Sequence, residues 1–171
     1  LLGAGLLLLV TDVDPMATMR EVEWPTLAFF AGLFVMVGGL VETGVIGKLA
    51  EATADVTGGD LTTATMVLLG GSAVLSAIVD NIPYVATMSP VVAELAAGHG
   101  EAGHVLWWAL ALGADLGGNA TAIGASANGV ALGLAEREGH PIGFWEFTRY
   151  GIVVTVTTVA VCIPYLWLRY L

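Results

Sequence analysis

Basic side chains are scarce in this sequence. Five Lys and Arg residues stand against fifteen Asp and Glu, which gives a formal net charge of −10 and an isoelectric point near 4.4. A chain this acidic binds poorly to nucleic acid or to an anionic membrane surface, so we expect no nucleic-acid partner. Most of the acidic residues lie between apolar segments, where we interpret them as a solvated rim.

The sequence also lacks the usual signs of an enzyme or a cofactor protein. The single cysteine, Cys162, excludes an internal disulfide and a multi-cysteine metal site. No nucleophile elbow, phosphate loop or zinc-binding spacing is present. A membrane protease that uses Asp80 and Asp115 is the one enzymatic alternative, and it is disfavoured because each aspartate adjoins a helix breaker. We therefore expect no enzymatic activity, no resident cofactor and no firmly held metal ion.

Charge of either sign is rare. Only 12% of the residues are charged, 57% are hydrophobic, and the mean hydropathy is +0.85. A soluble domain carries roughly 25% charged residues. A helix satisfies its backbone N–H and C=O groups by internal hydrogen bonds, so it is stable in a bilayer. A helix that spans the bilayer takes about 20 residues. We predict an all-α polytopic integral membrane protein of a prokaryotic inner membrane, with the lipid bilayer as its main partner.

Apolar segments divide the chain into five expected pieces. The sequence begins inside an apolar run, without Met or a basic flank, so we expect it to be a fragment of a longer protein. The predicted pieces are the end of a truncated span at 1–10, a span at 24–47, a re-entrant hairpin at 61–97, a broken helix at 105–136 and a span at 150–169.

The hairpin is predicted from the stretch "VDNIPY", which interrupts an apolar run and leaves no room for a solvated loop. We place its tip near 80–83, inside the protein, because non-helical backbone at membrane depth must be buried or line a cavity. Pro83 suits the first turn of a new helix, and Asp80 or Asn81 can cap that helix.

The second interruption is "DLGGNAT", with a break expected near 115–121. Gly117 and Gly118 permit unusual dihedral angles or the close approach of a ligand, and Asn119 or Thr121 can cap the following helix. Discontinuous helices with polar breaks are typical of secondary transporters. We expect the two new helix N-termini to face one cavity and to favour an anion or an oxygen-rich neutral solute.

The ends of the preceding half-helices offer a cation site together with Asp80 and Asp115. We expect either a sodium ion near Asp80, Asn81, Asp115 and Asn119 or proton exchange on the two carboxylates. In the alternative, the asparagines only cap helices, Asp115 pairs with a group elsewhere, and the small-residue run around Ser126 packs against a neighbouring helix. Both breaks would then be packing kinks in a membrane-embedded assembly subunit.

These motifs resemble those of the ion transporter superfamily, which includes bacterial arsenite and antimonite permeases, sodium/proton antiporters and the pink-eyed dilution protein. The similarity covers the chain from Glu23 onward. It is carried by "SAIVDNIPYVATMSPVV" and "GADLGGNATAIGASANGVALGLAEREG", with support from "FFAGLFVMVGGLVETGVI" and "GFWEFTRYG". The resemblance implies an inverted-repeat, elevator-type transporter in which this chain is the C-terminal repeat. Its partner would be the N-terminal repeat of the same protein, and a homodimer is left open.

The resemblance also implies a set of substrate- or ion-binding residues. These are Asp80, Asn81, Pro83 and Thr87 at the hairpin tip, and Gly117, Gly118, Asn119, Thr121 and Ser126 at the second break. Many relatives have a non-acidic residue where this chain has Asp115, which tilts the expectation toward proton or sodium coupling. We expect arsenite or antimonite efflux first and sodium/proton antiport second. Citrate-like di- or tricarboxylate transport is a third option, because the wider superfamily includes it, although no Arg lies near either break to hold a carboxylate.

Overall fold

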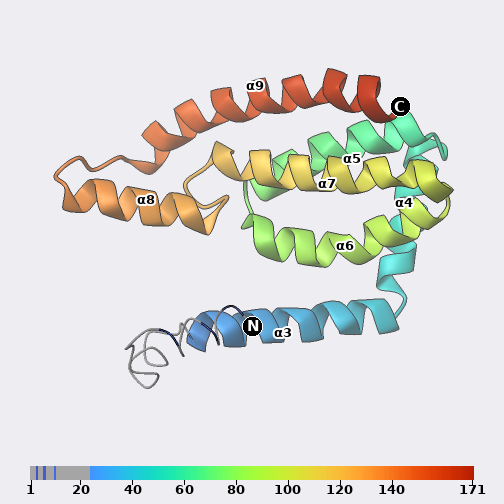
Figure 1. Ribbon diagram of the computed structural model, residues 1–171, viewed down its shortest axis with the longest axis horizontal. Coiled ribbons are helices and arrows are strands. Elements are labelled where there is room, and N and C mark those ends of the chain that lie inside the picture. The colour runs from blue at the N-terminus through green and yellow to red at the C-terminus, as the bar shows by residue number, and fades with distance from the viewer. Residues whose placement is uncertain (1–2, 4–5, 7–9, 11–23) are drawn as a thin grey trace. The chain divides into compact units, whose positions relative to one another are not determined.

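The computed structural model describes residues 3, 6, 10 and 24–171, and in this part of the chain every regular element is helical (Figure 1). The prediction of an all-α protein is therefore confirmed at that level, while the inverted repeat and the elevator movement stay predictions. The expected end of a span at 1–10 falls largely outside the described residues. The helices are α3 (Trp24–Glu42), α4 (Val45–Thr57), α5 (Leu61–Ser76), α6 (Asn81–Ala97), α7 (His104–Gly117), α8 (Ser126–Arg137) and α9 (Phe144–Tyr170), with 3₁₀ turns η1 (Gly100–Gly103) and η2 (Gly118–Ala120).

The chain forms two compact units, Leu1–Val35 and Met36–Leu171. The second unit contains α4 to α9 and both breaks. Among the described residues, α9 is the one helix that is long and apolar enough by itself to cross a membrane. The pair Leu27–Glu42 and Val45–Thr57 passes the same test only when the two helices are taken together as one bent span.

The segment predicted as a span at 24–47 is divided between α3 and α4. Gly44 takes a left-handed conformation with φ 71°, which ends the first helix and lets the second begin at Val45. Residues 48–57, which lie between the predicted span and the predicted hairpin, form the rest of α4. They are helical because Ile46, Ala50 and Thr57 recur on one face, and all three are buried.

Helix α7 lies at the centre of the second unit, where it packs against α5, α6 and α9 (Figure 1). Leu106 and Ala109 of α7 are fully buried, as are Leu69 of α5 and Val92 of α6. Burying such side chains is the main source of stability that the sequence offers. The core therefore holds α5, α6 and α7 against one another, while α8 contributes no residue to it.

Two glycines let α5 and α7 approach closely. Gly113 and Gly117 lie four residues apart, on one face of α7, and a Cβ atom at either position would overlap the backbone of Leu69 or Ala73 in α5. Gly151 does the same for α9, since a Cβ there would overlap the carbonyl groups of the η2 turn. Small residues at close helix crossings are typical of packing in membranes.

Candidate functional site

The first break separates α5 from α6 and consists of four residues, 77–80. Asp80 precedes α6, and its Oδ1 atom accepts the N–H of Ile82 at 3.1 Å. Of the two caps expected here, Asp80 is the one that forms. Pro83 lies in the first turn of α6, where its missing N–H leaves no helical bond unmade.

The second break runs from η2 through residues 121–125 to the start of α8 at Ser126, slightly later than the expected 115–121. The expectation that Asn119 or Thr121 caps α8 is wrong. Ala125 occupies the cap position and makes no side-chain cap bond, while the Thr121 hydroxyl donates to the carbonyl of Ala77 in the first break. The cap for α8 comes from elsewhere in the chain.

That cap is Asp80. Its Oδ2 atom accepts the N–H of Ser126 at 2.7 Å, while Oδ1 accepts from the start of α6. One carboxylate thus serves the N-termini of two helices whose first residues lie far apart in the sequence. Each helix N-terminus carries roughly half a positive charge, and an ionised carboxylate is the group that such a position favours. Asp80 therefore occupies the place that an anionic ligand would take.

Further bonds join the two breaks. The buried hydroxyl of Ser76, the last residue of α5, donates to the carbonyl of Ala114 in α7 at 2.6 Å. Gly124 lies against the carbonyls of Gly118 and Ser76, so that a Cβ would not fit there without a shift of backbone. Together with the Thr121 bond to Ala77, these contacts make the two interruptions one connected structure rather than two separate kinks.

Asn128 closes the second break from within. Its side-chain amide donates to the carbonyls of Gly118 at 2.8 Å and Thr121 at 2.9 Å. The sequence pattern gave no sufficient reason to include Asn128 in the site, because an asparagine two residues into a helix has many ordinary uses. Its position inside a small-residue run directly after a predicted break is the signal that points to it.

Side-chain donors also occupy the carbonyl end of α7. Thr155 of α9 donates to the carbonyl of Leu116 at 3.0 Å, in addition to the bonds that Ser76 and Asn128 make nearby. These are carbonyls that were expected to help hold a cation. Because they already have donors, a cation at this site would rely mainly on carboxylate and side-chain amide oxygens.

The remaining predicted residues are less connected. The side chains of Asn81, Asp115 and Asn119 make no hydrogen bond within the described part of the chain, and Asp115 and Asn119 are exposed. Thr87 donates to the carbonyl of Pro83 within α6. No group of three or more His, Cys, Asp or Glu side chains suited to a metal ion occurs among the described residues. The structure thus joins Asp80, Thr121 and Ser126, and leaves the other polar candidates outside that network.

Both predicted glycines have ordinary helical dihedral angles, φ −61° at Gly117 and φ −56° at Gly118. The close approach of α5 explains why position 117 lacks a side chain, and the close approach of Gly124 explains position 118. The unusual dihedrals considered from the sequence are therefore not used. Glycine permits tight packing here.

A buried pair that the sequence does not suggest lies inside the α5–α6 helix pair. The Tyr84 hydroxyl donates to the Ser72 Oγ atom at 3.0 Å, and both side chains are buried. A satisfied buried hydrogen bond of this kind fixes the relative position of two helices, because breaking it would leave polar atoms without partners.

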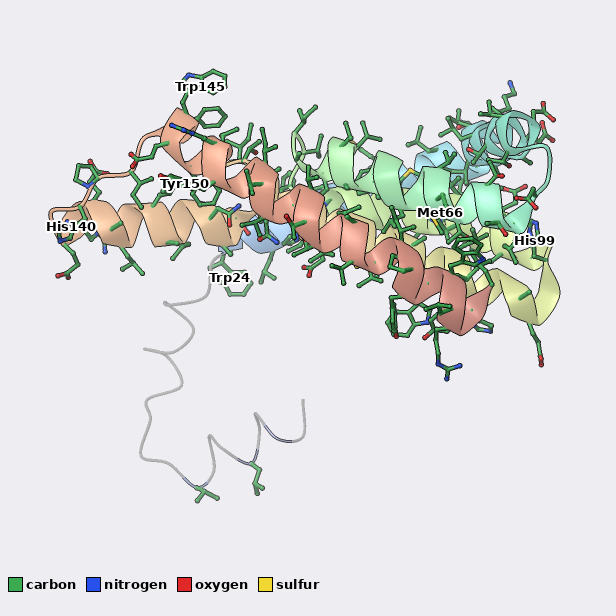
Figure 2. All side chains as sticks on the ribbon, turned by 90° about the horizontal axis from the view of Figure 1, so that it is seen from above. Trp24, Met66, His99, His140, Trp145 and Tyr150 are labelled. Carbon is green, nitrogen blue, oxygen red and sulfur yellow. The ribbon has the colours of Figure 1, made fainter. Side chains whose placement is uncertain are left out.

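Two hollows adjoin the two breaks within the described part of the chain. One, of about 560 Å³, lies between parts of α5 and α9 and has an almost wholly apolar lining. A second, of about 420 Å³, is lined by Asn119 together with Glu146 and Tyr150 of α9. Figure 2 shows Tyr150 on α9, near the end of the unit that carries Trp145. Asn119 is thus a predicted residue that lines one of these hollows.

The chain is similar in sequence to known membrane and transport proteins. An uncharacterized transporter of Mycobacterium tuberculosis (strain ATCC 25618 / H37Rv) is 58% identical over 172 residues, which cover 99% of this chain and 40% of that protein. The 46 kDa membrane protein of Mycobacterium leprae is 54% identical over 173 residues, 100% of this chain and 40% of that protein. The human P protein is 40% identical over 174 residues, 97% of this chain and 21% of that protein.

The chain therefore spans about two fifths of the length of these mycobacterial relatives. No solved structure gives a significant match. The profile of the family described as "Citrate transporter" matches residues 1–113, which include the first break and most of α7. The resemblance to the ion transporter superfamily is confirmed: the chain belongs to the citrate transporter family of integral membrane transport proteins.

Proposed function

We propose that the protein of which this chain forms part is a secondary active transporter of a small inorganic ion or solute in a prokaryotic inner membrane. The observation that supports this proposal is the double use of Asp80, whose carboxylate accepts backbone N–H groups from the starts of both α6 and α8. Broken helices whose N-termini meet at one polar position are the arrangement that transporters use for substrate and coupling ions.

A carboxylate in this position links cation binding to backbone geometry. Ionised, Asp80 offers two acceptor oxygens and serves both helices. Protonated, it becomes a donor at one oxygen and a weaker acceptor at the other, so at least one helix start loses its partner. A sodium ion on the carboxylate would compete with the same N–H groups. Proton or sodium binding would thereby change how the two breaks are held, which is the requirement for coupled transport.

Arsenite or antimonite efflux and sodium/proton antiport are the activities we propose, in that order. Arsenite near neutral pH is a small uncharged trihydroxide, which amides and hydroxyls can hold without displacing the charge of Asp80. Cys162 lies in α9, far along the chain from both breaks, so thiolate capture is not the mechanism of this segment. The side-chain amides of Asn81 and Asn119 make no hydrogen bond to another described residue, and they would be the first ligands.

Citrate transport is the third candidate, and it is considered because the matching family carries that description. The charge distribution of this chain speaks against it. The basic residues are Arg20, Lys48, Arg137, Arg149 and Arg169, and none lies in either break. A tricarboxylate would meet Asp80 without a cationic partner here. Citrate could bind this segment only with counter-charges from a bound cation or from the rest of the protein.

Flux measurements on the full-length protein in lipid vesicles test the proposal. Arsenite, sodium and citrate would each be offered under an imposed proton gradient and an imposed sodium gradient. We expect gradient-driven flux of arsenite or sodium, and slower or no flux of citrate. Absence of flux for all three would overturn the substrate assignments and favour an assembly subunit whose breaks are packing kinks.

A further inference from the structure

We propose that His99 is a proton-operated clamp at the end of the α5–α6 helix pair that lies away from Asp80. His99 follows the last turn of α6, and its ring spans from that turn to the link between α4 and α5. Figure 2 shows His99 at one end of the unit and His140 at the other. Charged His99 holds the two segments together, and loss of its proton releases one of them.

Both ring nitrogens of His99 face carbonyl oxygens. Nδ1 lies 3.0 Å from the carbonyl of Leu95, and Nε2 lies 3.3 Å from the carbonyl of Gly59. A carbonyl can only accept a hydrogen bond, and a neutral imidazole carries a single N–H. Only the imidazolium can donate to both oxygens at once. Both contacts can be hydrogen bonds only in the protonated ring, and the neutral ring must give up one of them.

The surroundings also favour positive charge. His99 lies where α4 and α6 both end, and the C-terminus of a helix carries a partial negative charge. Asp60, next to Gly59, caps α5. The N–H and the hydroxyl of Thr63 lower its pKa, and the charge of His99 lowers it further. The carboxylate and the ring are thus close enough to attract each other.

Other ionisable groups near His99 come from each adjoining element. Glu51 of α4 and Glu94 of α6 line the same hollow of about 210 Å³ as His99. Glu101 lies in the η1 turn that follows, with His104 directly after it. Apart from His104, which is exposed, every one of these groups is acidic.

The His99 contact joins α5 and α6 at the end of this helix pair that is opposite the first break. Gly59 lies two residues before α5, and His99 lies two residues after α6, so a bond between them joins the entry of the pair to its exit. Histidine is the side chain whose charge normally changes between pH 5 and 8. Opening of this end should therefore increase as pH rises through that range, whichever solute the protein carries.

Hydrogen–deuterium exchange on the full-length protein in lipid nanodiscs tests the clamp without any transported solute. The peptides of interest cover residues 58–65 and 95–103, compared at pH 5.5 and pH 8 after correction for the intrinsic exchange rate. We expect opening of both peptides to rise roughly fivefold at the higher pH, as loss of one exposed hydrogen bond of typical strength implies. A peptide from residues 150–160 of α9 serves as the internal reference and should not change.

The variant His99→Gln should show the same exchange at both pH values, because glutamine does not titrate. His104→Gln is the matched control and should keep the pH dependence of the unmodified protein. Unchanged pH dependence in His99→Gln would overturn the proposal. So would equal exchange at both pH values in the unmodified protein, a result that does not depend on how well any variant folds.

Discussion

At the scale of single residues, one side chain replaces two helix caps. Asp80 accepts from Ile82 and from Ser126, and the residue at the cap position of α8, Ala125, has no polar side chain of its own. No residue of α8 is buried, so few packing contacts fix this helix. Its start is held mainly by the Asp80 bond and by the two bonds of Asn128.

Replacing Asp80 with alanine should loosen both helix starts. Loss of a cap costs about 1 kcal/mol, which corresponds to roughly fivefold faster amide exchange at the first turns of α6 and α8. Asp80→Asn should be intermediate, because its single carbonyl oxygen can serve only one of the two sites well. Exchange measured on peptides covering residues 80–86 and 125–131 checks this. Unchanged exchange at the start of α8 in Asp80→Ala would show that the bond to Ser126 contributes nothing.

Glycine at 117 is a second residue-scale requirement. In Gly117→Ala the new methyl group would overlap the backbone of Ala73, so α5 and α7 must move apart. We expect destabilisation by about 1–3 kcal/mol, the usual cost of overpacking. Thermal unfolding of the full-length protein in detergent measures it.

The matched control is Gly129→Ala in α8, where nothing lies within 4 Å of the added Cβ. Replacing a helical glycine with alanine in open space should stabilise by roughly 0.5–1 kcal/mol. Equal effects of the two substitutions would contradict the close approach of α5 and α7.

At the scale of helices, local residues determine where α6 begins, whereas a long-range contact supplies the cap of α8. Pro83 and Asp80 already predict an interruption near 80, because a proline and a capping residue in succession favour the start of a helix. The acceptor for α8 could not be predicted, since Asp80 and Ser126 meet only when α5 packs on α7. The helical continuation through 48–57 was missed because its buried face is short and its other face is charged.

The N-terminus of α5 gives a pH-dependent prediction. Asp60 Oδ2 accepts the N–H of Thr63 at 2.7 Å, and bonds from Thr63 hold the pKa of Asp60 below its usual value. A carboxyl with a lowered folded-state pKa stabilises the helix above its unfolded pKa of about 3.9 and loses that contribution as pH falls through the folded value. The start of α5 should therefore fray as pH falls below about 4.

Amide exchange at residues 60–66 between pH 5 and pH 2.5 measures this fraying. Asp60→Asn should show less pH dependence, because asparagine also caps helices but does not titrate. If the substituted protein frays with acid as much as the original, the cap is not its cause.

At the scale of the whole molecule, the two interrupted segments form one unit around α7. The sequence indicates two breaks in apolar runs, and the family implies that such breaks contribute to a transport site. The sequence does not show that Gly113 and Gly117 face α5, because a pair of glycines in one helix gives no information about which other helix packs against it. Nor does it show that Asn128 and Thr155 occupy the carbonyls at the end of α7, since those contacts join residues from separate helices.

The most direct test of the role assigned to Asp80 is gradient-driven flux through the full-length protein in vesicles, with Asp80→Asn compared to the unmodified protein. Asp55→Asn, an exposed carboxylate of α4, is the control. We predict that the Asp80 variant responds roughly tenfold less to an imposed proton or sodium gradient, while the control responds normally. A full gradient response in Asp80→Asn would contradict the coupling role of this carboxylate.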